Sequence, residues 1–249
     1  MCVPVDAELP DLGLTSPLPS GTPIALTTMD GSRFRAYAAR AAEPSGTGFV
    51  VLPDVRGLIP FYERLAEALA SVGFDSVAID FYGRHEGLEP RDPDWDPWPT
   101  LDQMSYQQNI DDCGVAVEYL RSTGVHKVIT LGFCMGGALS LREAYTSHGL
   151  AGTVCAYGSP ADWAEYWPSA FDHVQEFDCP VLGLFGGADH AIDVEDVRAF
   201  DAALTDAGKS HEFTIYDGAP HSFFDKDYVE WAEASRDAWD RIVAFGRAC

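Results

Sequence analysis

The sequence has few basic residues and no apolar run of membrane length. It contains 16 Lys and Arg residues against 39 Asp and Glu residues, which gives a formal net charge of -23 at pH 7. Such an acidic chain repels nucleic acid and anionic membranes, so neither is expected as a partner. No stretch reaches the roughly 18 consecutive apolar residues of a membrane span. The first residues, MCVPVDAELPDLG, lack the basic and apolar segments of a secretion signal, so none is expected.

The sequence also lacks paired cysteines of the kind found in zinc sites and dithiol motifs. No C-x-x-C pair occurs among its six cysteines, which stand at positions 2, 113, 134, 155, 179 and 249. Cys155 in TVCAY and Cys179 at the start of CPVLGLF lie in apolar runs and are expected in the core. Unpaired thiols of this kind favour a reducing cytoplasm, and their spacing predicts no metal site.

What the sequence does contain is an alternation of short apolar runs with amphipathic helical segments. Strands are expected over 23–28, 33–40, 47–53, 75–80, 127–133, 152–158, 179–187 and 211–216. Helices are expected over 60–72, 105–122, 137–147, 194–207 and 227–246. This alternation predicts an α/β fold with a mostly parallel central sheet and helices on both faces. Residues 1–21, rich in Pro, Gly and Ser, are expected to form an N-terminal arm, and residues 22–249 a single domain.

One segment fits neither pattern. Residues 85–104, HEGLEPRDPDWDPWPTLDQM, carry four prolines and two tryptophans without helical or strand periodicity. Long irregular segments in compact domains usually serve a function, and tryptophans favour packing. We therefore expect this segment at the rim of a site, or as a partial lid over it.

The stretch GFCMGG, residues 132–137, places a cysteine where a predicted strand runs into a predicted helix. Glycines two residues before and two after Cys134 match the nucleophile elbow G-x-S-x-G with sulfur in place of oxygen. A helix N-terminus favours the thiolate form of such a residue. The amides of Met135 and of Val55, after the strand 47–53, are candidate oxyanion donors. The alternative is that Cys134 is an inert core thiol.

An elbow nucleophile needs an acid and a histidine downstream, in that order. Asp189 in LFGGADH follows one predicted strand, and His221 in DGAPHSFF follows the last one. Both therefore lie at the carboxyl ends of parallel strands, where α/β sheets gather their sites. Asp193 is a rival for the acid, and His190, next to Asp189, is expected to point elsewhere.

Five motifs together resemble the dienelactone hydrolase family of α/β-hydrolases, over residues 22–246. The motifs are VVLPDVRGL, AIDFYGR, LGFCMGGALS, GGADH and HSF. The resemblance implies a triad of Cys134, Asp189 and His221, with the two amides named above as the oxyanion hole. It also implies hydrolysis of a lactone or ester of the carboxymethylenebutenolide class, with neither cofactor nor metal.

The sequence departs from this family at two points. Asp54 stands where the family has a glutamate that holds the thiol, and it could instead be a loop-capping aspartate. Asp225 stands where the family has an arginine for the substrate carboxylate, which leaves Arg84 and Arg91 as candidates for that role. A small ester or lactone is the expected partner of a monomer or small homo-oligomer. A broader carboxylesterase or thioesterase, and a non-catalytic small-molecule receptor, remain as alternatives.

Overall fold

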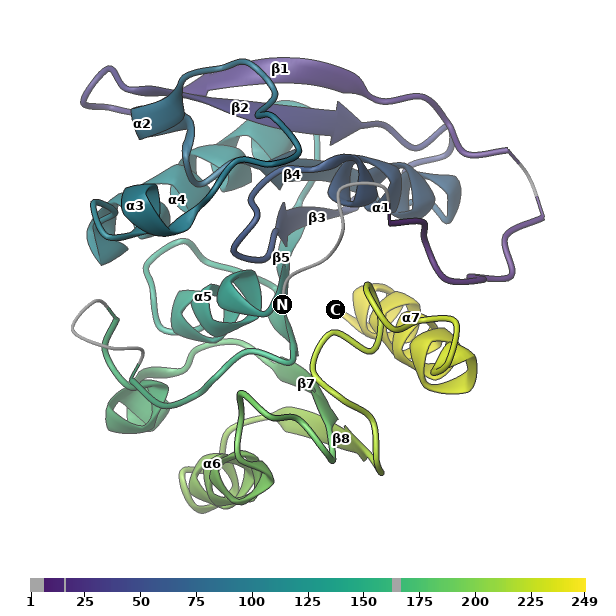
Figure 1. The fold of residues 1–249 in the computed structure, drawn as a ribbon, viewed down its shortest axis with the longest axis vertical. Helices are drawn as coiled ribbons and strands as arrows, with labels where there is room; N and C mark the ends of the chain where they lie inside the picture. Colours follow the sequence, from purple (N-terminus) through teal and green to yellow (C-terminus); the bar gives the residue numbers. More distant parts are fainter. Residues whose placement is uncertain (1–6, 16, 163–166) are drawn as a thin grey trace.

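The computed structural model describes residues 7–15, 17–162 and 167–249, which form one sheet between two layers of helices (Figure 1). The strands are β1 (Thr22–Thr27), β2 (Arg33–Ala39), β3 (Thr47–Leu52), β4 (Asp75–Ile79), β5 (Lys127–Phe133), β6 (Gly152–Ala156), β7 (Val181–Gly186) and β8 (His211–Tyr216). The helices are α1 (Pro60–Ser71), α2 (Gly83–Glu86), α3 (Trp98–Leu101), α4 (Tyr106–Ser122), α5 (Met135–Glu143), α6 (Val194–Asp206) and α7 (Ala232–Ala248), with a 3₁₀ helix η1 (Ala170–Glu176).

The sheet order is β1-β2-β4-β3-β5-β6-β7-β8. Strands β3 to β8 run parallel, and the β1–β2 hairpin is antiparallel and pairs antiparallel with β4. Helices α1 and α7 cover one face, and α4, α5 and α6 cover the other (Figure 1). The predicted fold, a mostly parallel sheet with helices on both faces, is confirmed.

The predicted elements differ from the observed ones mainly at helix ends. The helix predicted from residue 137 begins two residues earlier, at Met135, because the turn at Cys134 leads into it directly. The last helix begins at Ala232 rather than at 227, because residues 227–231 form turns. Short helices α2 and α3 were missed, since four residues are too few to show a period.

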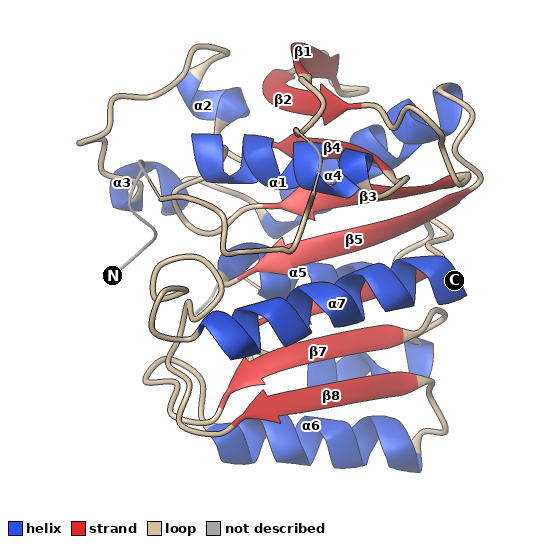
Figure 2. Ribbon diagram, turned by 90° about the vertical axis from the view of Figure 1, so that its right-hand side faces the viewer, coloured by secondary structure: helices blue, strands red, loops and turns tan. Residues whose placement is uncertain are grey.

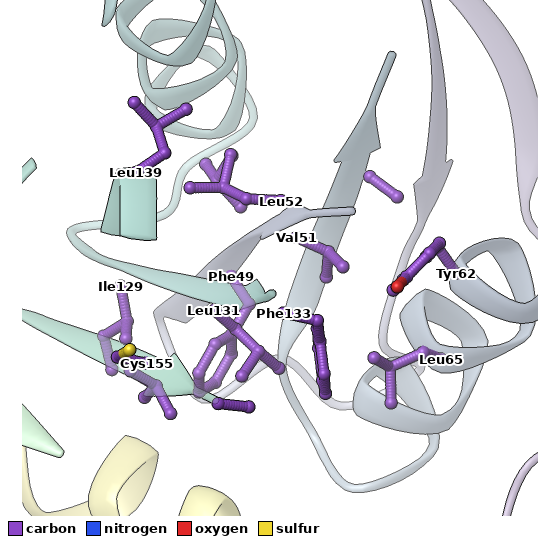
Figure 3. Close-up of a cluster of buried hydrophobic side chains, with 14 of the residues drawn as sticks. Phe49, Val51, Leu52, Tyr62, Leu65, Ile129, Leu131, Phe133, Leu139 and Cys155 are labelled. Carbon is purple, nitrogen blue, oxygen red and sulfur yellow. The ribbon is translucent and has the colours of Figure 1, made fainter. Parts of the chain in front are cut away.

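Packing in the hydrophobic core fixes the position of the carboxyl end of β5. Ile129, Leu131 and Phe133 of this strand are all buried, and Figure 3 shows them among side chains from β3 and α1. The ring centroid of Phe133 lies 5.7 Å from that of Tyr62 and 5.9 Å from that of Tyr157. Phe133 directly precedes Cys134, so aromatic packing on two sides fixes the backbone from which the thiol projects.

The carboxyl ends of the parallel strands meet at one edge of the sheet. In Figure 2 the arrowheads of β5, β7 and β8 point the same way, toward the side where long loops gather. The residues predicted to carry the chemistry follow β3, β5, β7 and β8 directly, so the topology alone brings them to this edge.

The described part of the predicted arm lies along α1. The Arg64 guanidinium donates to the carbonyl of Ala7, Glu67 accepts from the amide of Gly21, and Leu12 is buried. Residues 1–6, with Cys2, and residue 16 lie outside the described part. The boundary between arm and domain therefore stays a prediction. No helix within the described ranges is long and apolar enough to cross a bilayer.

Candidate active site

Cys134 sits at a strained turn between β5 and α5. Its φ of 52° and ψ of -113° are unfavourable for a residue with a side chain, and such strain tends to occur at functional sites. The turn is held by its own backbone. The Cys134 amide donates to the carbonyl of Ala156 at 3.0 Å, and its carbonyl accepts from the amide of Ala138 at 2.9 Å.

The two flanking glycines are required by close backbone contacts. A Cβ on Gly132 would lie 1.9 Å from the carbonyl oxygen of Gly136. A Cβ on Gly136 would lie 2.0 Å from the carbonyl oxygen of Leu52, at the end of β3. Neither clash can be relieved by moving a side chain, because both partners are backbone atoms. The structure thus places Cys134 at a turn of the elbow type, half-buried rather than in the core.

His221 and Asp189 are hydrogen-bonded to each other. His221 Nδ1 lies 2.7 Å from Asp189 Oδ2, and since a carboxylate only accepts, Nδ1 carries the proton. The other oxygen of Asp189 accepts from the amides of Ala191 at 2.8 Å and Ile192 at 3.1 Å. The rival acid, Asp193, instead caps α6 by accepting from the amide of Glu195. The bond from His221 Nδ1 to Asp189 holds the imidazole of His221 in place and leaves its Nε2 available for a second partner.

A cavity of about 370 Å³ brings the predicted residues together. Its lining includes Asp54, Val55, Cys134, Met135 and His221. The residues that supply the thiol, the imidazole and the two predicted oxyanion amides therefore all line the same cavity. That arrangement can support nucleophilic attack on a bound carbonyl group.

The prediction that His190 points away from the site is wrong. His190 lines the cavity, and its ring centroid lies 5.9 Å from that of His221. The cause is the turn around Asp189, whose carboxylate accepts from amides two and three residues further along. The tight turn that these hydrogen bonds stabilise directs the side chain of His190 toward the cavity.

Tyr157 is a site residue that the sequence did not reveal. It follows β6, has a φ of 38° and lines the cavity. Its ring packs edge-on against His221 at 5.2 Å, and its hydroxyl donates to Asp225 Oδ2 at 2.7 Å. The available signal was its place in CAYGSP, at the carboxyl end of a predicted strand, where polar side chains collect at the site edge.

Asp54 and Asp225 form a buried acidic pair at the site. Asp54 is 1% exposed and lines the cavity, and Asp225 is 0% exposed. Burial, and secondly the charge of Asp54, raises the pKa of Asp225 to about 8. The second oxygen of Asp225 accepts from the amide of Lys226. Asp54 also caps its own turn, because it accepts a hydrogen bond from the amide of Arg56 at 2.8 Å. Asp54 is therefore both a loop-capping aspartate and a residue of the cavity lining.

The two candidate substrate arginines do not line the cavity. Arg84 pairs with Asp112 at 2.6 Å and with Asp30 at 2.7 Å. Arg91 pairs with Asp80, and its guanidinium lies over the ring of Trp95 at 4.6 Å. Neighbouring carboxylates and aromatic rings thus occupy both guanidinium groups, and this placement gives no support to a substrate-binding role.

The proline-rich segment contributes one residue to the cavity. Trp98, in α3, lines it and is 55% exposed, whereas Trp95 packs against Tyr82 at 4.9 Å. The segment therefore reaches the rim through a single exposed indole. No group of three or more potential metal ligands occurs within the described ranges.

Comparison with known proteins assigns most of the chain to the family that its sequence motifs resemble. The model of the dienelactone hydrolase family matches residues 34–248. A Saccharolobus solfataricus relative is 30% identical over 254 residues, covering 88% of this chain and 95% of the relative. A carboxymethylenebutenolidase of Rhodococcus opacus is 31% identical over 215 residues, covering 81% of each chain.

Solved structures show the same fold. A Klebsiella pneumoniae protein of the dienelactone hydrolase type superposes with a TM-score of 0.76 at 25% identity, covering 91% of this chain and 99% of its own. A dienelactone hydrolase-like promiscuous phosphotriesterase from metagenomic libraries gives 0.73 at 21% identity, covering 92% and 98%, a likeness of fold alone. The chain belongs to the dienelactone hydrolase family and is a carboxylic ester hydrolase of the α/β-hydrolase fold.

Proposed function

We propose that the protein hydrolyses a small carboxylic ester or lactone with Cys134 as nucleophile, His221 as general base and Asp189 as the residue that orients His221. The observation that carries the proposal is the 2.7 Å bond between His221 Nδ1 and Asp189. With Nδ1 protonated and committed to Asp189, Nε2 is the nitrogen that can accept the thiol proton. Cys134 and His221 line the same cavity, which gives both access to one substrate.

The reaction proceeds in two acyl-transfer steps. His221 takes the proton of Cys134, and the thiolate attacks the ester carbonyl carbon. The amides of Val55 and Met135 stabilise the oxyanion, each contributing on the order of 3 kcal/mol. The C–O bond of the ester breaks, the alkoxide takes the proton from His221, and a thioester remains on Cys134. Water, deprotonated by His221, then cleaves the thioester and releases the carboxylic acid and the free thiol.

The position of Cys134 at the start of α5 supports a reactive thiol. The helix has nine residues, and its first amides point toward the cysteine that caps it. Such a terminus favours an anion, so it stabilises both the thiolate and the oxyanion.

A lactone of the carboxymethylenebutenolide type is one candidate substrate, because the Rhodococcus opacus relative bears that name. The second candidate is a broader range of linear esters or thioesters, which the mainly apolar lining of the cavity favours. A substrate panel of lactones against linear esters separates the two. A non-catalytic receptor would have no need of a hydrogen-bonded acid and imidazole. We further expect a cytoplasmic monomer or small homo-oligomer that needs no cofactor.

The nucleophile assignment is tested by Cys134→Ala on 4-nitrophenyl acetate. We expect kcat to fall by about 10⁴-fold or more, because in the proposed mechanism the acyl intermediate forms on this thiol. Iodoacetamide should inactivate the native protein, with the label found on Cys134 by mass spectrometry. Cys249→Ser, which removes a half-buried thiol at the chain end, is the matched control and should inactivate like the native protein. Activity within tenfold of native in Cys134→Ala would remove the assignment.

A further inference from the structure

The cavity that holds Cys134 carries negative charge and no permanent positive charge. Its lining includes the carboxylates of Asp54 and Asp162, and its only basic groups are the imidazoles of His190 and His221. No lysine or arginine lines it within the described residues. The remaining residues, MCVPVD, Ser16 and WAEY (163–166), contain neither residue type, so every lysine and arginine lies in the described ranges.

Three arginines that do not line the cavity, Arg56, Arg84 and Arg91, are bonded to other groups. Arg84 is bonded to Asp112 through Nε and NH2, and Arg91 is bonded to Asp80 through both terminal nitrogens. Arg56, next to Val55 in sequence, donates to the carbonyl of Pro93 at 2.9 Å. Arg84 and Arg91 would have to give up these carboxylates to bind an anionic substrate. Arg56 has a buried Nε without a hydrogen-bond partner among the described residues, but it does not line the cavity.

A fourth arginine lies behind the cavity wall. Arg142 is 0% exposed and donates to the carbonyls of Ala138 at 2.7 Å, Ser159 at 3.2 Å and Ala161 at 2.7 Å. Ala138 and Ser159 themselves line the cavity. Arg142 itself is fully buried and does not line the cavity, so it fixes these wall residues and offers no surface for an anion.

The carboxylate of Asp54 makes an anionic ligand costly. It is 1% exposed, so its charge is screened by little water, and a second carboxylate placed in the same cavity would meet strong repulsion. The rest of the lining is mainly apolar and includes Val55, Trp98, Met135 and Ile192. Such a surface suits hydrocarbon groups on either side of an ester.

We propose that this site selects uncharged esters or lactones with apolar substituents, and that the acidic, cation-free lining of the cavity excludes esters bearing a carboxylate. This inference rests on the proposed function, since it names the substrate class of the same nucleophile. Of the two candidate substrates named there it favours uncharged esters, because a carboxymethylenebutenolide itself carries a carboxylate. It makes the charge of the cavity, rather than its size, the property that sets specificity.

A matched pair of substrates tests the inference. Mono-4-nitrophenyl glutarate carries a carboxylate, and its methyl ester has the same reacting ester and chain with that charge removed. We expect the native protein to cleave the neutral methyl ester with a kcat/KM about tenfold or more above that of the anion, at pH 7 and low salt. Equal cleavage of both, or preference for the anion, would overturn the inference and leave the proposed function intact. If neither is cleaved, the proposed function itself fails.

A charge placed at the rim tests the cause. Trp98 is exposed and lines the cavity, so Trp98→Arg brings a guanidinium to the mouth without burying it. Trp98→Gln is the matched control, since it also removes the indole but adds no charge. Relative to Trp98→Gln, Trp98→Arg should raise kcat/KM for the anionic ester by about tenfold, with little difference between them for the methyl ester. A gain that is equal for both esters, or no gain for the anion, would show that charge does not control selection.

Discussion

Two aspartates each bond to a residue that lines the cavity, Asp189 to His221 and Asp225 to Tyr157, but their surroundings differ. Asp189 receives three hydrogen bonds, from His221 and from the amides of Ala191 and Ile192, so its two oxygens are satisfied by donors. Asp225 follows His221 by four residues in the same loop, yet it is fully buried beside a second carboxyl group, Asp54. Its donors include the Tyr157 hydroxyl, the amide of Lys226 and the side chain of Ser222.

The difference shows that burial alone does not decide what a carboxyl group does. Asp189 has a basic partner, and its pairing with His221 suits it to orient an imidazole and stabilise the imidazolium. Among the described residues, the hydrogen-bond donors of Asp225 include no basic side chain. Burial and, secondly, the charge of Asp54 raise its pKa to about 8, so the group holds a proton at neutral pH. Under the proposed mechanism Asp189 acts as an anion, whereas Asp225 is a buried acid that keeps its proton at neutral pH.

Replacing each aspartate by asparagine should affect kcat very differently, and this is the largest difference expected between Asp189 and Asp225. Asp189→Asn should lower kcat for 4-nitrophenyl acetate by about 10³-fold or more, because an amide no longer stabilises the imidazolium and can force the wrong tautomer of His221. Asp225→Asn should lower it by less than about tenfold, since the protonated acid and the amide are alike in shape and charge. Thermal unfolding of both variants checks that each is folded. A loss in Asp225→Asn equal to that in Asp189→Asn would end the distinction.

The second effect is on stability against pH. The Asp225 carboxyl keeps its proton up to about pH 8 in the folded chain, whereas an unfolded aspartate loses it near 4. Between these values the folded state binds more protons, so stability falls as pH rises, by about 1.4 kcal/mol per pH unit from this group, and levels off above its folded pKa.

Asp225→Asn should lack that slope. Urea unfolding of the native protein and of this variant from pH 5 to 9 measures the difference between the two stability curves. The curves should diverge up to about pH 8, with the variant relatively more stable at the alkaline end. Parallel curves over the whole range would mean that Asp225 titrates normally.

The smallest expected effect concerns the hydrogen bond from Tyr157 to Asp225 and its influence on the pKa of Asp225. Its hydroxyl donates to Asp225, and this bond lowers the pKa of that carboxyl against the effect of burial. Tyr157→Phe keeps the ring against His221 and removes the donor, so the end of the pH-dependent window should move to higher pH. The stability loss should be about 1–2 kcal/mol, and larger above pH 8 than at pH 5. A window that moves to lower pH would contradict this account of the pair.

Much of this molecule could be predicted from local sequence pattern. The strands were predictable because buried parallel strands form short apolar runs between turn residues, as in TGFVVLP and KVITLGF. Cys134 was predictable because Gly132 and Gly136 mark a turn that only glycine permits. The hydrogen bond between Asp189 and His221 was foreseeable from their places after parallel strands, and the structure supplies its geometry.

Other features depend on contacts between distant segments. From the sequence, Arg84 and Arg91 were candidates for binding a substrate carboxylate, but in the structure they form ion pairs with Asp112 and Asp80. The local sequence around each arginine does not predict these partners. His190 was misjudged because the direction of its side chain depends on the turn that Asp189 organises. Tyr157 has no motif of its own, and its role arises only where β6 meets the loop after β8.

The sequence by itself determined the alternation of strands and helices, the glycine-flanked turn at Cys134 and the order of the acid and the histidine, because each follows from short-range sterics and periodicity. Only the tertiary structure decided which charges meet. It enclosed Asp54 and Asp225 together and paired Arg84 and Arg91 with other carboxylates. Among the described residues that line the cavity it left no lysine or arginine. Electrostatic energy depends on distance and on exclusion of water, and chain folding sets both.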